Sequence, residues 1–220
     1  MTCEPKDEKE TIVSATSTPC KELEQASAAQ ITMQDLLAGD IIATRAHTAN
    51  SAFVRGATLG PVSHAILYTG EYKGYHSAVD AMPEQGVTRA TLSKKLSQAS
   101  YAVVFRHRTA SPEQCKKACA WAAHQALMNK PYDYKSAARV GAVMPYFKMS
   151  LLIVLASINI HDPNVMAPSP QDEDASFMCS ELVFRAYEIA GAPLTHKPAY
   201  CMSPQTLFKT DRLTCLGRLK

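Results

Sequence analysis

The sequence has neither a strongly basic block nor a long apolar run. Its formal net charge is only +3, and it has no block of five to eight residues rich in lysine or arginine. Basic residues are also not interleaved with aromatic ones. A nucleic-acid partner is therefore not expected. The longest apolar stretch, SLLIVLASINI at residues 150–160, is about half the length that a membrane-spanning helix needs. We expect no transmembrane segment, and we interpret 150–160 as a buried helix or an insertion packed on the core.

Metal-ligand and disulfide spacings are also missing. The seven cysteines include no CxxC pair, and the sequence contains no HExxH motif. Cys115 and Cys119 lie one helical turn apart, which we interpret as packing, because a metal pair would need further ligands from elsewhere. We therefore expect no metal, no cofactor and no disulfide framework, and synthesis in a reducing compartment.

The N-terminus lacks the basic end and the apolar core of a signal peptide. Residues 1–30 are too polar to bury much surface, and we predict that they form a mobile tail. Residues 31–220 remain for a single domain, which is long enough for one substantial hydrophobic core. The protein is thus predicted to be made in the cytoplasm without a classical signal peptide.

The chain does contain a series of strand patterns followed by helical ones. Alternation and β-branched residues predict strands at 40–45, 63–70, 74–82, 86–92 and 101–107. Ser111 and Pro112 have N-cap and N1 chemistry, and they begin a helix that we expect to reach Asn129. Shorter helical segments are expected at 31–39, 50–60 and 132–143, and a proline-rich loop at 161–175. This order predicts a single α+β domain in which an antiparallel sheet packs against helices.

The segment ASFMCSELVFRAYEIAG, residues 175–191, places a cysteine near the start of an amphipathic helix. With Ser176 as the N-cap, Cys179 would occupy the third helical position, where the helix dipole and free backbone N–H groups favour a thiolate. The same N–H groups could hold a developing oxyanion. The alternative is that Cys179 is an inert packing residue, as a lone cysteine on an apolar stripe usually is.

A partner base is available in the strand patterns. His64 begins the run SHAILYTG, and Asp80 lies in the next run, SAVDAM. A hairpin turning near residue 72 would pair residues whose numbers sum to about 144, and His64 and Asp80 would then be cross-strand neighbours. The carboxylate could orient the imidazole. The alternatives are a satisfied histidine at a strand end and an aspartate that caps the turn before Pro83. His76 is the rival histidine.

Five motifs in sequence order carry a family resemblance: GDIIATR, SHAILYTG, SAVDAM, YDY and FMCSELVFRAYE. Over about residues 35–215 they resemble the circularly permuted branch of the NlpC/P60 papain-like superfamily, the YiiX/YebB-like group. The resemblance implies a permuted papain-like fold with Cys179 as nucleophile, His64 as general base and Asp80 as the group that orients His64. Tyr132 and the serines next to the reactive pair, Ser63 and Ser180, are assigned to substrate binding. Packing is the alternative for Tyr132. Residues 141–175 form a helical insertion on this interpretation.

The family implies hydrolysis of amide bonds in the stem peptides of peptidoglycan. Some members are effectors of type VI secretion, so the resemblance also implies a toxin that acts in the periplasm of a target cell, with an immunity protein and a secretion-apparatus component as partners. Two alternatives stay open. One is a lipid thioesterase or acyltransferase on the same fold, with 140–147 and 150–160 as an apolar entrance. The other is a non-catalytic binding protein in which Cys179 and His64 are merely packed.

Overall fold

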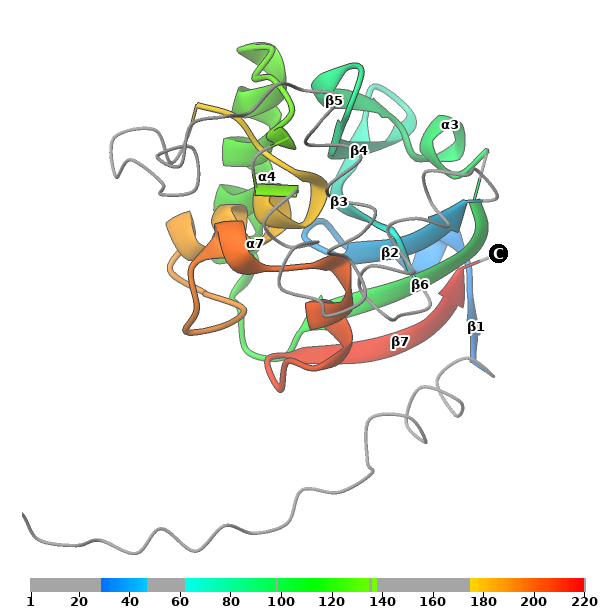
Figure 1. The fold of residues 1–220 in the computed structure, drawn as a ribbon. Coiled ribbons are helices and arrows are strands. Elements are labelled where there is room, and N and C mark those ends of the chain that lie inside the picture. The colour runs from blue at the N-terminus through cyan, green and yellow to red at the C-terminus, as the bar shows by residue number, and fades with distance from the viewer. Residues whose placement is uncertain (1–28, 47–61, 98, 135, 138–174, 220) are drawn as a thin grey trace, which may run out of the picture.

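The computed structural model describes residues 29–46, 62–97, 99–134, 136–137 and 175–219 (Figure 1). Seven strands form one sheet in the order β1-β7-β6-β2-β3-β4-β5, and the helices α4 and α7 cover one of its faces. This arrangement confirms the predicted α+β class. All neighbouring strands are antiparallel except β1 and β7, which are parallel.

The bounds of β2 to β6 lie close to the predicted ones, whereas β1 and β7 were not predicted from the sequence. The strands are β1 Gln30–Ile31, β2 Ile41–Ala46, β3 His64–Tyr72, β4 Tyr75–Met82, β5 Gly86–Thr91, β6 Ala99–His107 and β7 Leu213–Leu219. The α-helices are α3 Leu92–Leu96, α4 Pro112–Leu127 and α7 Cys179–Ile189, and the 3₁₀ helices are η1 Met33–Asp35, η3 Ala199–Cys201 and η4 Pro204–Phe208.

The helix expected at 31–39 is wrong, because only the single turn η1 forms there. The Asp35 carboxylate accepts hydrogen bonds from the backbone N–H and the hydroxyl of Thr32, each at 2.8 Å, and Leu36 is already extended. The helix beginning after Ser111 is confirmed, with Ser111 as its N-cap. The expected helix at 50–60, the stretch 150–160, residues 141–174 of the expected insertion and residues 1–28 of the expected tail lie outside the described residues.

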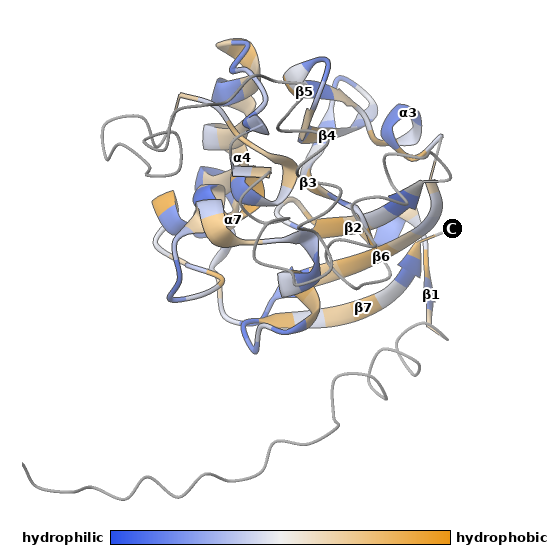
Figure 2. Cartoon of the chain, in the orientation of Figure 1, coloured by the Kyte–Doolittle hydropathy of each residue, from blue (hydrophilic) through white to orange (hydrophobic). Residues whose placement is uncertain are grey.

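The sheet is buried on both faces. In β2, Ile41 and Ala43 belong to the apolar cluster beneath α4 and α7, whereas Ile42 packs on the opposite face with Ile66 and Val104. Figure 2 shows this as apolar colour along β2 and β6 in the middle of the sheet. A strand covered on both sides loses the polar half of its alternation, which explains the run of apolar residues in β2.

The β3–β4 hairpin differs in register from its prediction. Its turn consists of Lys73 and Gly74, both with positive φ, and Leu67 pairs with Val79 beyond a bulge near Gly70. Paired numbers therefore exceed the expected sum by two, and His64 and Asp80 are not directly opposite each other. A shift of two residues leaves every side chain on its predicted face, because side chains alternate with a period of two. The two residues still lie on one side of the hairpin.

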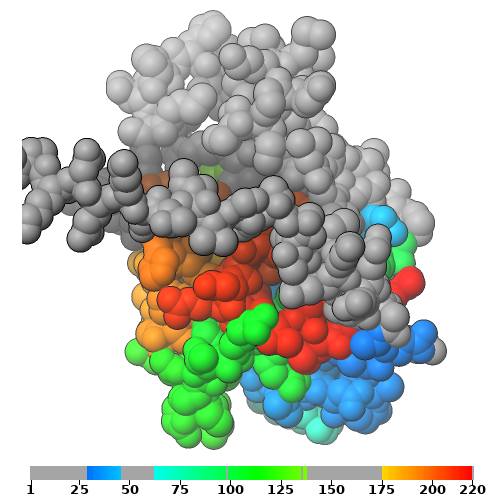
Figure 3. All heavy atoms as spheres, turned by 90° about the horizontal axis from the view of Figure 1, so that it is seen from below, coloured from blue at the N-terminus to red at the C-terminus, as the bar shows by residue number. Residues whose placement is uncertain are grey.

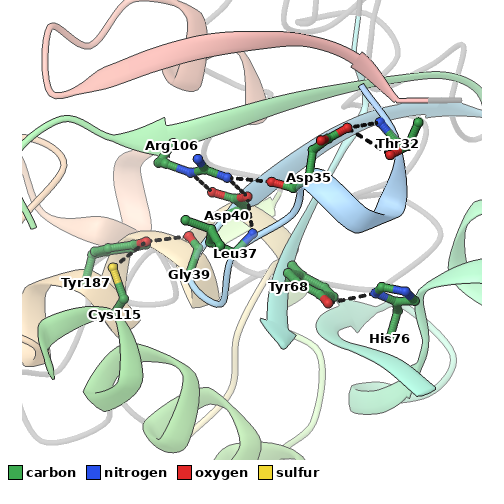
Figure 4. Close-up of polar contacts among 10 residues, drawn as sticks. All are labelled: Thr32, Asp35, Leu37, Gly39, Asp40, Tyr68, His76, Arg106, Cys115 and Tyr187. Carbon is green, nitrogen blue, oxygen red and sulfur yellow. Dashed lines mark hydrogen bonds and ion pairs between the residues drawn. The ribbon is translucent and has the colours of Figure 1, made fainter. Parts of the chain in front are cut away.

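Two polar contacts fasten α7 and η1 to the sheet (Figure 4). The Tyr187 hydroxyl, near the end of α7, donates to the carbonyl oxygen of Gly39, immediately before β2. Arg106 of β6 makes two hydrogen bonds of 2.7 Å to the carboxylate of Asp40, which is 1% exposed. Bidentate pairs of this kind fix geometry as well as contributing energy. Arg106 also donates to the carbonyl of Asp35 at 3.0 Å and so ties η1 to β6, whereas the Tyr187 bond ties α7 to the residues that lead into β2.

The strand β7, near the C-terminus, lies between β6 and the first strand, β1. β7 pairs with β6 on one side and with β1 on the other, and Figure 3 shows C-terminal residues (red) against N-terminal ones (blue). The backbone N–H of Arg218 donates to the carbonyl of Ala29 at 2.8 Å. In the described part of the chain, no helix is long and apolar enough to cross a membrane.

Candidate active site

Cys179 is the first residue of α7, not its third, so the prediction of Ser176 as the N-cap is wrong. The preceding residues are held extended, because the backbone N–H of Phe177 donates to Pro131 and its carbonyl accepts from Asp133. The Glu181 side chain accepts from the N–H of Met178 at 3.1 Å and closes the start of the helix. The thiol therefore lies among amide groups that have no acceptor within the helix.

His64 and Asp80 meet beside this helix start. His64 is the first residue of β3, and its Nε2 lies 2.9 Å from Oδ2 of Asp80 in β4. The Cys179 sulfur forms hydrogen bonds with the His64 ring and with the backbone N–H groups of Ala65 and Ser180. The structure thus brings Cys179, His64 and Asp80 into one continuous polar chain.

The charges of Cys179 and His64 stabilise each other. Burial alone opposes ionisation of the thiol, but the charge and hydrogen bond of His64 and the two backbone N–H groups outweigh it and lower the pKa of Cys179. Burial also opposes the charged imidazole, yet the thiolate and Asp80 raise the pKa of His64 to about 10. Between these two pKa values the pair exists as thiolate and imidazolium, the form in which a cysteine is nucleophilic.

The other oxygen of Asp80 is held by two residues that sequence reasoning did not single out. Oδ1 contacts the ammonium group of Lys95 and accepts from the Thr88 hydroxyl at 3.1 Å. Burial raises the pKa of Asp80, but His64 and Lys95 together outweigh it and keep that pKa below its ordinary value. Lys95 lies in the polar stretch SKK, which by pattern alone is typical of a solvent-exposed helix.

The residues assigned to substrate binding occupy different settings. Tyr132 lies close to the nucleophile, because it forms a bridge with Phe177, and burial and the charge of Cys179 raise its pKa. The buried Ser180 hydroxyl donates to the carbonyl of Met202 at 2.6 Å, so its backbone N–H, not its hydroxyl, faces the sulfur. Ser63, directly before His64, is buried and its N–H donates to Thr44.

His76 and the two cysteines of α4 have other surroundings. His76 Nδ1 lies 2.8 Å from the Tyr68 hydroxyl (Figure 4). Burial raises the pKa of Cys119 to about 12 and also raises that of Cys115, as expected for packed thiols. Among the residues that the structure describes, no three His, Cys, Asp or Glu side chains are arranged to hold a metal ion.

Comparison with known proteins agrees with this geometry. The family model of permuted papain-like amidases, the YaeF/YiiX family C92, matches residues 35–217. The crystal structure of the metalloprotein YiiX from Escherichia coli O157:H7 is similar in fold, with a TM-score of 0.54 and 20% identity, over 82% of this chain and 96% of that one. The comparison with curated proteins found no significant match.

Proposed function

Because the chain belongs to the permuted papain-like amidase family, we propose that Cys179 is its nucleophile, His64 its general base and Asp80 the group that orients His64. At the level of the family it is a cysteine amidase or hydrolase. The stem peptides of peptidoglycan are the substrate that we propose. The observation that carries the proposal is the continuous contact from the Cys179 sulfur through the His64 ring to the Asp80 carboxylate.

The proposed reaction uses these groups in sequence. The thiolate attacks the carbonyl carbon of an amide, and the amide N–H groups at the start of α7 stabilise the oxyanion that forms. The His64 imidazolium then gives its proton to the departing amine as the C–N bond breaks, which leaves a thioester on Cys179. Neutral His64 removes a proton from water, hydroxide attacks the thioester, and the acid is released with the thiolate restored.

Digestion of purified peptidoglycan sacculi tests both the class and the bond. Wild type, Cys179→Ala and His64→Ala are incubated with sacculi, and released fragments are analysed by mass spectrometry. We expect new peptide termini from the wild type and a loss of at least about a thousandfold in both variants. Cys201→Ala, which removes an exposed thiol, is the matched control and should cleave like the wild type. Intact sacculi with wild type, or cleavage by Cys179→Ala, would contradict the proposal.

We further propose that the enzyme is an antibacterial effector, delivered by a secretion apparatus and neutralised in the producing cell by an immunity protein. The support is the proposed substrate, because peptidoglycan is reached only outside the cytoplasm. Expression with and without an added export signal tests this. Cell lysis should require both export and Cys179, and harmless export of the active enzyme would rule out toxicity.

A lipid thioesterase or acyltransferase is the second candidate, and one observation favours it. The Tyr132 ring packs against Tyr134 at 5.1 Å, and the Tyr134 hydroxyl donates to the carbonyl of Pro83. Large apolar side chains are exposed at the end of β4, at the end of α4 and at Tyr134: Met82 (38%), Leu127 (77%), Met128 (57%) and Tyr134 (58%). An acyl chain could contact such a surface. Faster turnover of fluorogenic acyl esters than of muropeptides, dependent on Cys179, would favour this candidate.

A further inference from the structure

Lys95 is a buried charge that the reaction described above does not use. It belongs to α3, the short helix that follows β5, and its side chain is only 7% exposed. Lys95 follows the fully buried Leu92 by three positions and therefore shares its face of the helix, toward the sheet. Ser93 and Lys94 lie on the exposed face. The fold thus directs one lysine of the SKK stretch inward and the other into solvent.

The contacts of Lys95 divide the two oxygens of Asp80 between two partners. Its ammonium group pairs with Oδ1 and also donates to the Thr88 hydroxyl at 3.0 Å. Oδ2 is thereby left to His64. A carboxylate held at one oxygen by an ammonium and a hydroxyl cannot rotate without breaking both contacts. Lys95 and Thr88 therefore fix the direction in which Asp80 presents its other oxygen to the imidazole.

Among the four groups in contact from Cys179 through His64 and Asp80 to Lys95, the charges balance only when Lys95 is included. Titratable groups reach this site from each packed element: His64 from β3, Asp80 from β4, Lys95 from α3, and Cys179 and Glu181 from α7, with the neutral Tyr132 beside the sulfur. Glu181 accepts from the N–H of Met178 and is not part of the contacts that run from Cys179 to Lys95. Thiolate, imidazolium, carboxylate and ammonium sum to zero. Without the lysine the ionised group carries one net negative charge in a buried setting, which is strongly unfavourable.

We propose that Lys95 is a positioning residue of the active site, which orients Asp80 and supplies the positive charge that lets Cys179 ionise while Asp80 stays charged. This inference rests on the roles proposed above for Cys179, His64 and Asp80. When Lys95 is removed, the remaining groups are neutral if Cys179 keeps its proton, so we expect the thiol to ionise less readily.

The test is the pH dependence of Cys179 alkylation by iodoacetamide, followed by peptide mass spectrometry. At a pH below the wild-type midpoint, Lys95→Met should alkylate about tenfold more slowly, because its midpoint moves up by about one unit. Lys95→Arg, which keeps the charge, should restore most of the rate. Lys94→Met, which removes an exposed charge from the same helix, should behave as wild type. Thr88→Val removes an Asp80 contact without a charge and should shift the midpoint less than Lys95→Met.

An unchanged midpoint in Lys95→Met, or an equal shift in Thr88→Val, would overturn the proposal. If Lys95→Met does not fold, the test passes to the Asp80→Asn background, where both buried charges can be removed together. There the added Lys95→Met change still removes the positive charge and should raise the midpoint, and an unchanged midpoint would overturn the proposal. A wild-type Cys179 that alkylates only near its ordinary pKa would instead refute the proposed nucleophile, so the two failures are distinguishable.

Discussion

At the scale of single residues, the lowered pKa of Cys179 follows from a competition between burial and charge. Burial destabilises the thiolate, but the neighbouring imidazolium and two backbone N–H groups stabilise it by more, so the pKa is lowered. The same competition gives His64 its raised pKa, because the two groups hold each other in the charged form.

The pH dependence of hydrolysis should therefore be bell-shaped. Activity should rise as pH passes the lowered pKa of Cys179, where the thiolate forms, and fall as pH passes about 10, where His64 loses the proton it must donate. His64→Ala should move the alkylation midpoint of Cys179 upward, because burial is then opposed only by the backbone N–H groups. Initial rates and iodoacetamide kinetics across pH measure both effects. A wild-type midpoint at or above the ordinary value of about 8.5 would favour the non-catalytic alternative.

Gly39 is a residue whose replacement should be costly for two separate reasons. Its φ is +99°, and a Cβ atom there would lie 2.9 Å from both the Cβ of Cys115 and the hydroxyl oxygen of Tyr187. Strain and overpacking together should lower the free energy of unfolding of Gly39→Ala by about 2–4 kcal/mol.

Urea denaturation measures this loss, and Gly74 provides the control. Gly74 also has a positive φ of +79°, but nothing lies within 4 Å of its added Cβ. Gly74→Ala should therefore show the backbone cost alone, about 1–2 kcal/mol. Equal losses in the two variants would mean that the contacts with Cys115 and Tyr187 do not restrict this position.

At the scale of elements, the pairing of β1 with β7 covers what would otherwise be an edge strand. β1 contributes only Gln30 and Ile31, together with the hydrogen bond from Arg218 to Ala29. Exposed edges offer unpaired backbone groups to other chains. A chain beginning at Thr32 should consequently unfold about 1–2 kcal/mol more easily than one beginning at Ala29 and should associate at high concentration. Urea denaturation and light scattering check this, and identical behaviour would show that β1 stabilises nothing.

The elements differ in how far the sequence could predict them. Alternation was sufficient for β2 to β6, and Ser111 with Pro112 was sufficient for the start of α4. The hairpin register was wrong because a two-residue turn and a bulge near Gly70 shift the strands without changing the hydrophobic pattern. The start of α7 was wrong because the backbone of Phe177 pairs with Pro131 and Asp133, a long-range contact that no local signal reveals.

At the scale of the whole molecule, the first residue of α7 packs beside the ends of β3 and β4 that lie away from their hairpin turn. Cys179, His64 and Asp80 meet there. The proximity of Cys179, His64 and Asp80 was predictable, since two sit at the start of recognisable elements and the third shares a hairpin face. Lys95 was not predictable. Its inward orientation depends on the packing of α3, and a lysine in a polar stretch gives no sign of burial.

The hydrogen bond between Tyr187 and Gly39 joins parts of the chain 148 residues apart. This separation affects the order in which the parts of the site come together during synthesis. The hairpin with His64 and Asp80 can form early from neighbouring segments, whereas α7 leaves the ribosome later and packs on strands β2 to β6, which precede it in the chain. A nascent chain that ends before α7 therefore contains the proposed base, His64, without the proposed nucleophile, Cys179.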